Sequence, residues 1–388
     1  MVSEFFQWVW ANGLAFVFIL SVVVFIHELG HYLAAKRAGV RVEVFSLGFG
    51  PELWGWNDRS GTRWRVSMLP LGGYVKMFGE SMPTELTGKT TDEIAADSPK
   101  PLTAEEKAVS FAHKSLPRRA GIVAAGPAAN FVLAWIVLAA LFIVVGRPFT
   151  PPEIGSVSPD SAAAAAGLQP GDVFVRVGGE SVKRFEDVRR IVSMSPERPM
   201  PIIVRRDGTE MTITATPRRS VITDNFGNRQ EVGLLGVSRA GQAFETLSPV
   251  SAFGAAAEET YQVTVGTLQA VGQIITGSRP ADELGGPIRI AQMSGQAAQS
   301  GLANVFWFLA VLSINLGLIN LFPVPLLDGG HLLFYGFEAL RGRPLSDRVV
   351  EYGFRVGLGL VVTLFIFVTY QDLSRFQKVV DFFRGLVS

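Results

Sequence analysis

The chain has no cysteine and only four histidines in 388 residues. Without cysteine it can form neither disulfide bonds nor thiolate metal sites, so any metal must be held by histidine, aspartate or glutamate. Charged residues make up only 18% of the chain and hydrophobic residues 48%, which is too apolar for an ordinary soluble enzyme. The formal net charge is +1, so no basic excess indicates nucleic acid as a partner.

Four long apolar runs predict membrane-spanning helices at residues 14–35, 121–146, 303–322 and 353–369. No lysine or arginine precedes the first run and no small-residue cleavage site follows it. We therefore expect this run to remain in the mature protein instead of serving as a signal peptide. Residues 261–275 contain several glutamines and threonines, which favours an amphipathic helix on the membrane surface over a fifth span. The predicted fold class is a polytopic α-helical membrane protein.

The distribution of positive charges predicts the orientation of the spans. Residues 1–35 contain no lysine or arginine, whereas positive residues cluster between the first two spans and again between the last two. Both connections are therefore expected to be cytoplasmic, with both termini and residues 147–302 outside; three positive residues in the tail run mildly against this pattern. The clusters are Lys36, Arg37, Arg41, Lys114, Arg118 and Arg119 in the first connection and Arg341, Arg343, Arg348 and Arg355 in the second.

Composition divides the chain into four parts. Residues 1–146 hold the first two spans and a connection in which "VRVEVFSLGFG" and "TRWRVSMLPLGGYVKM" predict a β-hairpin or small sheet at the membrane surface. In residues 147–242, β-branched runs alternate with turn dipeptides around a helical pattern at 185–192, which predicts an inserted β-rich domain of about 90 residues. Residues 243–302 are expected to form amphipathic connecting helices. Residues 303–388 hold the last two spans and the tail.

The stretch "VVVFIHELGHYLAA", residues 22–35, places two histidines and a glutamate in the first span. His27 and His31 are four residues apart, so on a helix they share one face and can both reach one metal ion. In H-E-x-x-H zinc hydrolases the glutamate, here Glu28, is the general base for the water that the metal activates. Ionisable groups inside a span are costly and typical of function, which favours this interpretation over histidines packed in a core. His27 lies about 20 Å along the span, toward the predicted cytoplasmic side.

A catalytic zinc needs a third protein ligand and one open position. The best source is "NLGLINLFPVPLLDGGHLL", residues 315–333, because Pro323 and Pro325 cannot continue a helix. Irregular backbone at membrane depth is tolerated where it lines a cavity. Asp328 follows this break, level with both histidines, and is the predicted third ligand of one Zn²⁺ ion per chain.

These motifs resemble the bacterial RseP-type branch of the site-2 protease family. The resemblance rests on H-E-x-x-H in the first span, N-x-x-P-x-P-x-x-D-G-G in the third, "GFGP" at 48–51, "GGYVKM" at 72–77 and "GPAANFVLA" at 126–134. It implies a zinc-dependent intramembrane endopeptidase in which His27, His31 and Asp328 bind zinc and Glu28 is the base. Asn320 matches the family asparagine thought to hold the substrate backbone.

Within the inserted domain, "SAAAAAGLQPGDVFVRVGGESV", residues 161–182, resembles a bacterial PDZ domain, a module that binds extended peptides or chain ends by strand addition. One copy is recognisable, whereas some members of the family have two. "GLLGV", residues 233–237, is either its carboxylate-binding loop, which we slightly favour, or only its last strand. The domain would then exclude untrimmed substrates or capture new chain ends.

The resemblance also implies substrates and a location. Substrates would be single-span membrane proteins such as anti-sigma factors, cut after an upstream site-1 protease has trimmed them, and leftover signal peptides. The protein would lie in the lipid of the bacterial inner membrane, with its active site near the cytoplasmic face. An edge strand containing Gly72, Gly73 and Tyr74 would hold the substrate in an extended form, although plain hairpin packing explains "GGYVKM" equally well.

Two further histidines, His331 and His113, lie outside the predicted set of zinc ligands. His331 is expected either beside the ligands or simply at the membrane interface, and not as a ligand itself, because a fourth protein ligand would close the site to water. His113 is expected at the membrane interface.

A metal transporter would show internal repeats and a path of polar groups, which we do not find. A catalytically inactive scaffold would have no reason to keep Glu28 beside the ligands.

Overall fold

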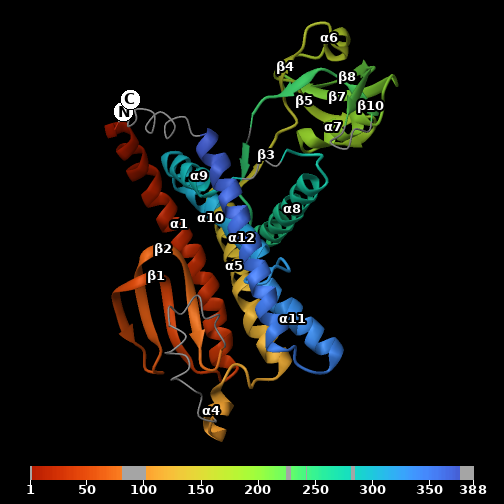
Figure 1. Cartoon of the computed structure of the whole chain (residues 1–388). Coiled ribbons are helices and arrows are strands. Elements are labelled where there is room, and N and C mark those ends of the chain that lie inside the picture. Colours follow the sequence, from red (N-terminus) through yellow and green to blue (C-terminus); the bar gives the residue numbers. More distant parts are fainter. Residues whose placement is uncertain (1, 81–101, 224–228, 242, 281–284, 376–388) are drawn as a thin grey trace. The chain divides into compact units, whose positions relative to one another are not determined.

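The computed structural model describes residues 2–80, 102–223, 229–241, 243–280 and 285–375 (Figure 1). The chain forms two compact units. The first comprises Met1–Ala139, Ala256–Leu268 and Ala281–Ser388, and the second comprises Ala140–Ala255 and Gln269–Pro280. Two long helices, α5 (Leu116–Val144) and α8 (Pro249–Ile275), contribute residues to both units.

Four helices are long and apolar enough to cross a membrane, and they contain the four predicted apolar runs almost entirely. They are α1 (Val2–Arg37), α5, α10 (Leu302–Asn320) and α12 (Asp347–Arg375). Among the described residues, α8 is not one of these candidate spans, although it includes the helix expected at 261–275. Three shorter helices complete the helical part of the first unit: α4 (Ala104–Val109), α9 (Pro287–Gln299) and α11 (Asp328–Arg341).

Small residues let α1, α5 and α10 approach one another closely. A Cβ atom added at Gly30 of α1 would collide with the backbone carbonyl of Ala125 in α5. A Cβ atom at Gly317 of α10 would lie only 3.1 Å from the carbonyl oxygen of Pro127. Helices in lipid associate through such close packing, because lipid tails are as apolar as leucine side chains. Residues 125–130 of α5 therefore form the meeting point of the three helices.

Helix α9 is tied to the last span by a buried carboxylate. Asp372 of α12 accepts hydrogen bonds from the backbone N–H groups of Gly286, Ile288 and Arg289, at 3.0–3.1 Å. The first N–H groups of a helix have no partner within the helix. Asp372 therefore caps α9 and fixes it against α12.

The predicted hairpin folds into a curled sheet that packs beside α1 (Figure 1). Residues 42–47 pair antiparallel with 73–77, while residues 52–57 pair antiparallel with 63–67. Phe45 and Val75 are buried in the core between this sheet and the helices. The two strands are β1 (Val42–Asn57) and β2 (Arg63–Met77).

The second unit contains the expected β-rich domain. Its central sheet has four strands in the order β6-β5-β7-β8, and Phe174, Val177, Ile202 and Val204 are buried on it. The helix expected at 185–192 is present as α7 (Phe185–Ser193). Three two-stranded pairs, β4 with β11, β9 with β10 and β3 with β12, complete its described sheets. The remaining elements are β3 (Arg147–Phe149), β4 (Ile154–Val157), α6 (Ala162–Ala166), β5 (Val173–Val177), β6 (Glu180–Ser181), β7 (Met200–Arg206), β8 (Thr209–Ala215), β9 (Arg218–Thr223), β10 (Arg229–Leu234), β11 (Val237–Arg239) and β12 (Ala243–Glu245).

Candidate metal centre

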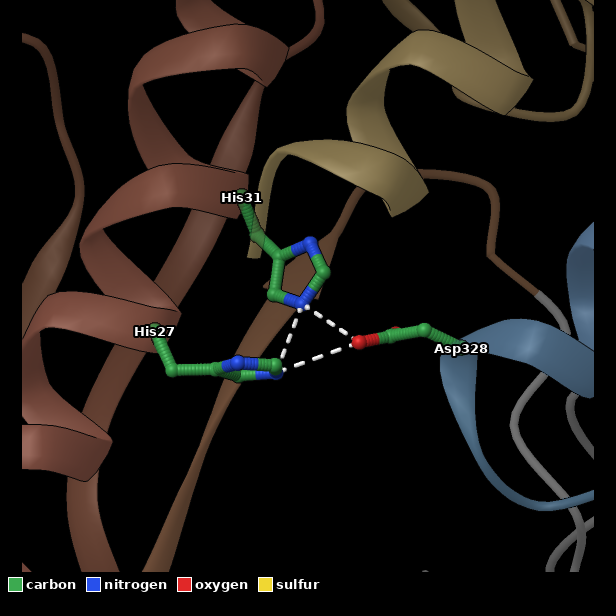
Figure 2. Close-up of side chains that lie close together, drawn as sticks. All are labelled: His27, His31 and Asp328. Atoms are coloured by element: carbon green, nitrogen blue, oxygen red, sulfur yellow. Dashed lines mark hydrogen bonds and ion pairs between the residues drawn. The ribbon is translucent and has the colours of Figure 1, made fainter. Parts of the chain in front are cut away.

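Helix α1 brings two histidines and a glutamate to one cavity. His27, Glu28 and His31 are 7%, 8% and 8% exposed, and all three line a cavity of about 450 Å³. One helical turn separates the histidines, so their rings come together on the same side of α1 (Figure 2). Buried polar groups are costly unless they have partners. The partners come from two other parts of the first unit.

The first partner is Asp328, which is delivered by a tight turn. Helix α10 ends at Asn320 and α11 begins at Asp328, because the prolines between them cannot continue a helix. Leu326 has a φ of 106°, a conformation that non-glycine residues rarely adopt and that is typical of functional sites. A Cβ atom at Gly329 or Gly330 would collide with backbone carbonyls of the preceding loop. The turn therefore requires both glycines, and it directs Asp328 toward α1 (Figure 2).

Three side-chain atoms converge at the centre of this site. His27 Nε2 lies 3.2 Å from His31 Nε2, and Asp328 Oδ2 lies 3.1 Å from His27 Nε2 and 3.4 Å from His31 Nε2 (Figure 2). Asp328 Oδ2 is buried and has no hydrogen-bond donor in good geometry among the described residues. His31 Nδ1 lies 2.9 Å from the carbonyl oxygen of Ile122, which can only accept. In the neutral ring the proton is therefore on Nδ1, and a lone pair on Nε2 faces the carboxylate. A cation would stabilise this arrangement.

The donor set and its spacing fit zinc. A tetrahedral zinc ion with bonds of about 2.0–2.1 Å separates its ligand atoms by about 3.3–3.4 Å. The three observed separations are 3.1–3.4 Å. Within the described part of the chain, His27, His31 and Asp328 form the one group of metal-ligating side chains close enough to share an ion. Two imidazoles and one carboxylate leave a fourth position open, as catalytic zinc sites require.

Helix α5 supports both histidines from behind. Its residues Ile122, Gly126 and Asn130 follow one another at intervals of one turn. The Ile122 carbonyl accepts from His31, and the Asn130 side-chain nitrogen Nδ2 lies 3.2 Å from His27 Nδ1. Between them, Gly126 leaves the space that the His31 ring occupies, because a Cβ atom there would collide with that ring. Second partners of this kind fix the orientation of metal-binding histidines.

The residues predicted to hold substrate line the same cavity. Gly72, Gly73 and Tyr74 of β2 and Asn320 of α10 all border it, together with Glu28. A Cβ atom at Gly73 would lie 3.0 Å from Glu28 Cγ, so β2 passes directly over the predicted base. The structure thus brings together every site residue expected from the sequence.

The two remaining histidines differ in position. His331 lines the cavity, and burial lowers the pKa of its imidazole, which favours the neutral ring. Its ring centroid lies 5.2 Å from that of Phe354. His113 Nδ1 lies 3.0 Å from Ser110 Oγ, and His113 is not among the residues that line the cavity.

Several residues of the site were not expected from the sequence. Glu80 lines the cavity, accepts a hydrogen bond from the Met77 N–H at 3.2 Å, and has its pKa raised to about 7 by burial. The one feature of the sequence that could have indicated Glu80 as a site residue was its position three residues after "GGYVKM". The Ile122 carbonyl left no signal, because every residue has one. Asn130 lies in the quoted "GPAANFVLA" stretch, but nothing there indicated that its side chain meets His27.

The sequence is similar to known proteins over most of its length. Residues 15–364 match the model of peptidase family M50. A protein named as a candidate zinc metalloprotease in Rhizobium meliloti is 44% identical over 368 residues, which cover 92% of this chain and 95% of that protein. A protein with the same description in Agrobacterium fabrum is 44% identical over 363 residues, covering 92% and 94%. The metalloprotease MmpA of Caulobacter vibrioides is 36% identical over 386 residues, covering 95% and 97%.

The purified protein should contain about one zinc ion per chain. Alanine at His27, His31 or Asp328 should each lower the zinc content strongly, because losing one of three ligands opens the coordination shell. His331→Ala is the matched control and should keep its zinc. Elemental analysis after gel filtration measures the content, and full retention of zinc in Asp328→Ala would show that another group completes the site.

Gly126→Ala should weaken zinc binding about 10- to 100-fold, because the added methyl group displaces the His31 ring. Gly121→Ala, on the same helix, is the control, since nothing lies within 4 Å of a Cβ atom at that position. Competition with a chelator of known affinity measures both variants. Equal affinities for the two would mean that α5 does not fix His31.

Proposed function

This chain belongs to peptidase family M50 and is a zinc metalloendopeptidase, and from that premise we propose that it cleaves peptide bonds inside the transmembrane segments of single-span membrane proteins. The family and the four apolar helices indicate a multi-pass membrane protein. The observation that carries the proposal is the position of both metal-ligating histidines inside the candidate span Asn12–Arg37. A peptide bond of the substrate must therefore reach these histidines within the membrane.

Hydrolysis also explains the residues around the metal centre better than the other classes of function. Glu28 lines the same cavity as His27, His31 and Asp328, and it is not one of the three converging ligands. An inactive scaffold has no use for a carboxylate at this position. A peptidase needs one as a base.

In this mechanism Glu28 moves the protons. Its carboxylate takes a proton from the attacking water as the water oxygen bonds to the peptide carbonyl carbon. The same proton passes to the amide nitrogen as the C–N bond breaks, so the carboxylate is regenerated. When bound by His27, His31 and Asp328, zinc supplies a Lewis acid that makes water more acidic and polarises the carbonyl.

Residues 73–77 of β2 are the proposed binding edge for an extended substrate. Within the described residues they pair on one side only, with residues 42–47. Strand addition to such an edge holds a peptide by its backbone. An extended form is required, because the backbone of an intact helix is already hydrogen-bonded and sterically closed. The close approach of the Gly73 backbone to Glu28, where an added Cβ atom would lie 3.0 Å from Glu28 Cγ, supports this role because it puts the edge next to the base. Asn320 of α10, which lines the same cavity, is proposed to hold the substrate backbone as well.

The proposed location is the bacterial inner membrane, with the active site near the cytoplasmic face. The positive residues between the first and second spans and between the third and fourth spans support this orientation. The proposed substrates are regulators such as anti-sigma factors, after an upstream site-1 protease has trimmed them, and remnant signal peptides. The process would be regulated intramembrane proteolysis, with membrane lipid as the surrounding partner and no role for nucleic acid.

The β-rich domain is proposed to act as a PDZ-like module that controls access. A groove of about 280 Å³ lies between α7 and residues 232–237, which include "GLLGV". At Gly233 the strand packs so tightly on α7 that a Cβ atom would collide with the Val192 carbonyl. Exclusion of untrimmed substrates is favoured over capture of chain ends, because "GLLGV" is a weak signal for a loop that captures chain ends.

Glu28→Gln should keep zinc but lose cleavage by several orders of magnitude, because an amide cannot take a proton from water. The assay uses a single-span test protein in the same membranes, with the product ends mapped by mass spectrometry. Wild type should cut inside the apolar segment. Cuts confined to residues outside that segment would reject intramembrane proteolysis, while leaving the peptidase assignment in place.

Deletion of residues 152–240 should leave zinc content unchanged and loosen substrate choice. The metal ligands all belong to the other unit, so the deleted domain supplies no catalytic group. If the domain excludes substrates by size, the deletion variant should cut a long, untrimmed substrate that the intact protein does not cut. If it captures chain ends, the deletion should slow cleavage of a trimmed one. Unchanged rates on both substrates would reject any role in access.

A further inference from the structure

Asn130 is a buried polar residue that the hydrolytic mechanism does not use. It is 0% exposed on α5, inside the candidate span Leu116–Val144. Its side-chain nitrogen Nδ2 lies 3.2 Å from His27 Nδ1, and its side-chain oxygen Oδ1 is buried without a hydrogen-bond partner. Its backbone carbonyl accepts from Ser313 Oγ of α10 at 2.9 Å. The side chain and the backbone of Asn130 therefore serve different neighbours.

The two possible orientations of the amide have opposite consequences for His27. With the nitrogen toward His27, Asn130 donates to Nδ1, so the proton of the neutral ring must sit on Nε2. That proton would point at His31 Nε2 and Asp328 Oδ2, 3.2 and 3.1 Å away, where a metal would bind. With the amide turned by 180°, the oxygen faces His27, accepts from Nδ1–H, and leaves a lone pair on Nε2. Both orientations have the same shape, so only hydrogen bonding distinguishes them.

The pairing of His31 provides a precedent within the same site. The Ile122 carbonyl, two helical turns from Asn130 on α5, can only accept, so it places the proton of His31 on Nδ1. Both imidazoles need a lone pair on Nε2 if both are to bind one ion with Asp328. An acceptor behind His27 would complete the same pattern from the same helix.

We propose that Asn130 is a positioning residue that accepts the Nδ1–H of His27 through its side-chain oxygen, and so sets the tautomer in which His27 Nε2 can bind zinc. Ile122 does the same for His31 through its backbone. Helix α5 thus fixes both imidazoles of the centre, with Gly126 between them leaving room for the His31 ring. The inference rests on His27 being a zinc ligand.

A side-chain substitution tests this role, because the hydrogen bond from Ser313 goes to the backbone of residue 130 and does not involve the substituted side chain. Asn130→Asp keeps the shape and can accept but, when ionised, cannot donate. Asn130→Leu has a similar volume and can do neither. The asparagine-to-leucine control is Asn12→Leu, which removes a buried amide (4% exposed) from α1 at a residue that does not line the cavity.

Zinc affinity is measured for the full-length variants by chelator competition, with His27→Ala alongside. Asn130→Asp should bind zinc within a few-fold of wild type, whereas Asn130→Leu should bind about 10- to 100-fold more weakly. Asn12→Leu should be unchanged. Unaltered affinity in Asn130→Leu, or equal weakening in Asn130→Asp and Asn130→Leu, would overturn the proposal. Unaltered affinity in His27→Ala would instead mean that the ligand assignment itself is wrong.

A second measurement needs no variant and so does not depend on folding. In the metal-free wild type with ¹⁵N-labelled histidine, at a pH where the imidazoles are neutral, two-bond ¹H–¹⁵N spectra distinguish Nδ1–H from Nε2–H. The proposal expects the His27 ring to carry its proton on Nδ1 before any ion binds. A His27 ring with its proton on Nε2 would overturn the proposal even if Asn130→Leu failed to fold.

Discussion

The metal centre depends on how closely α1 and α5 approach each other. At Gly30 no side chain fits between the helices, and at Gly126 the His31 ring fills the space that a side chain would take. This contact brings the Ile122 carbonyl to His31 and Asn130 to His27. A larger residue at either glycine would separate the helices or displace the ring, so the orientation of the imidazoles is a product of helix packing.

The polar groups near the centre are paired in a way that the apolar surroundings demand. Inside a membrane span, burying a polar group without a hydrogen-bond partner costs roughly several kcal/mol of free energy, because no water replaces the missing hydrogen bond. Ser313 therefore donates to the backbone of Asn130, and the side chain of Thr267 donates to Asn315. Asn130 Oδ1 and Asp328 Oδ2 are exceptions, and Asp328 Oδ2 lies beside His27 and His31. A cation bound between this carboxylate oxygen and the two imidazoles would supply the partner that the oxygen lacks.

Irregular backbone supplies the parts of the site that a straight helix cannot. Asp328 reaches α1 through a turn that contains a strained Leu326 and two glycines with no room for a side chain. Strand β2 passes over Glu28 because Gly73 has no side chain. The turn before Asp328 and strand β2 both border the cavity, where the proposed extended substrate would lie beside the base.

The sequence alone determined the spans, the hairpin, the β-rich domain and the pairing of His27 with His31, because hydrophobic periodicity and a four-residue spacing are local properties. It also indicated Asp328, since two prolines must break a helix just before it. Tertiary structure decided how these three side chains are held. Ile122 acts through a carbonyl that every residue has, Asn130 lies 103 residues from His27 in the chain, and Glu80 lies in a turn with little pattern of its own. The contacts of Ile122 and Asn130 depend on which turn of α5 faces α1, and that register is set by packing between helices, which no local pattern records.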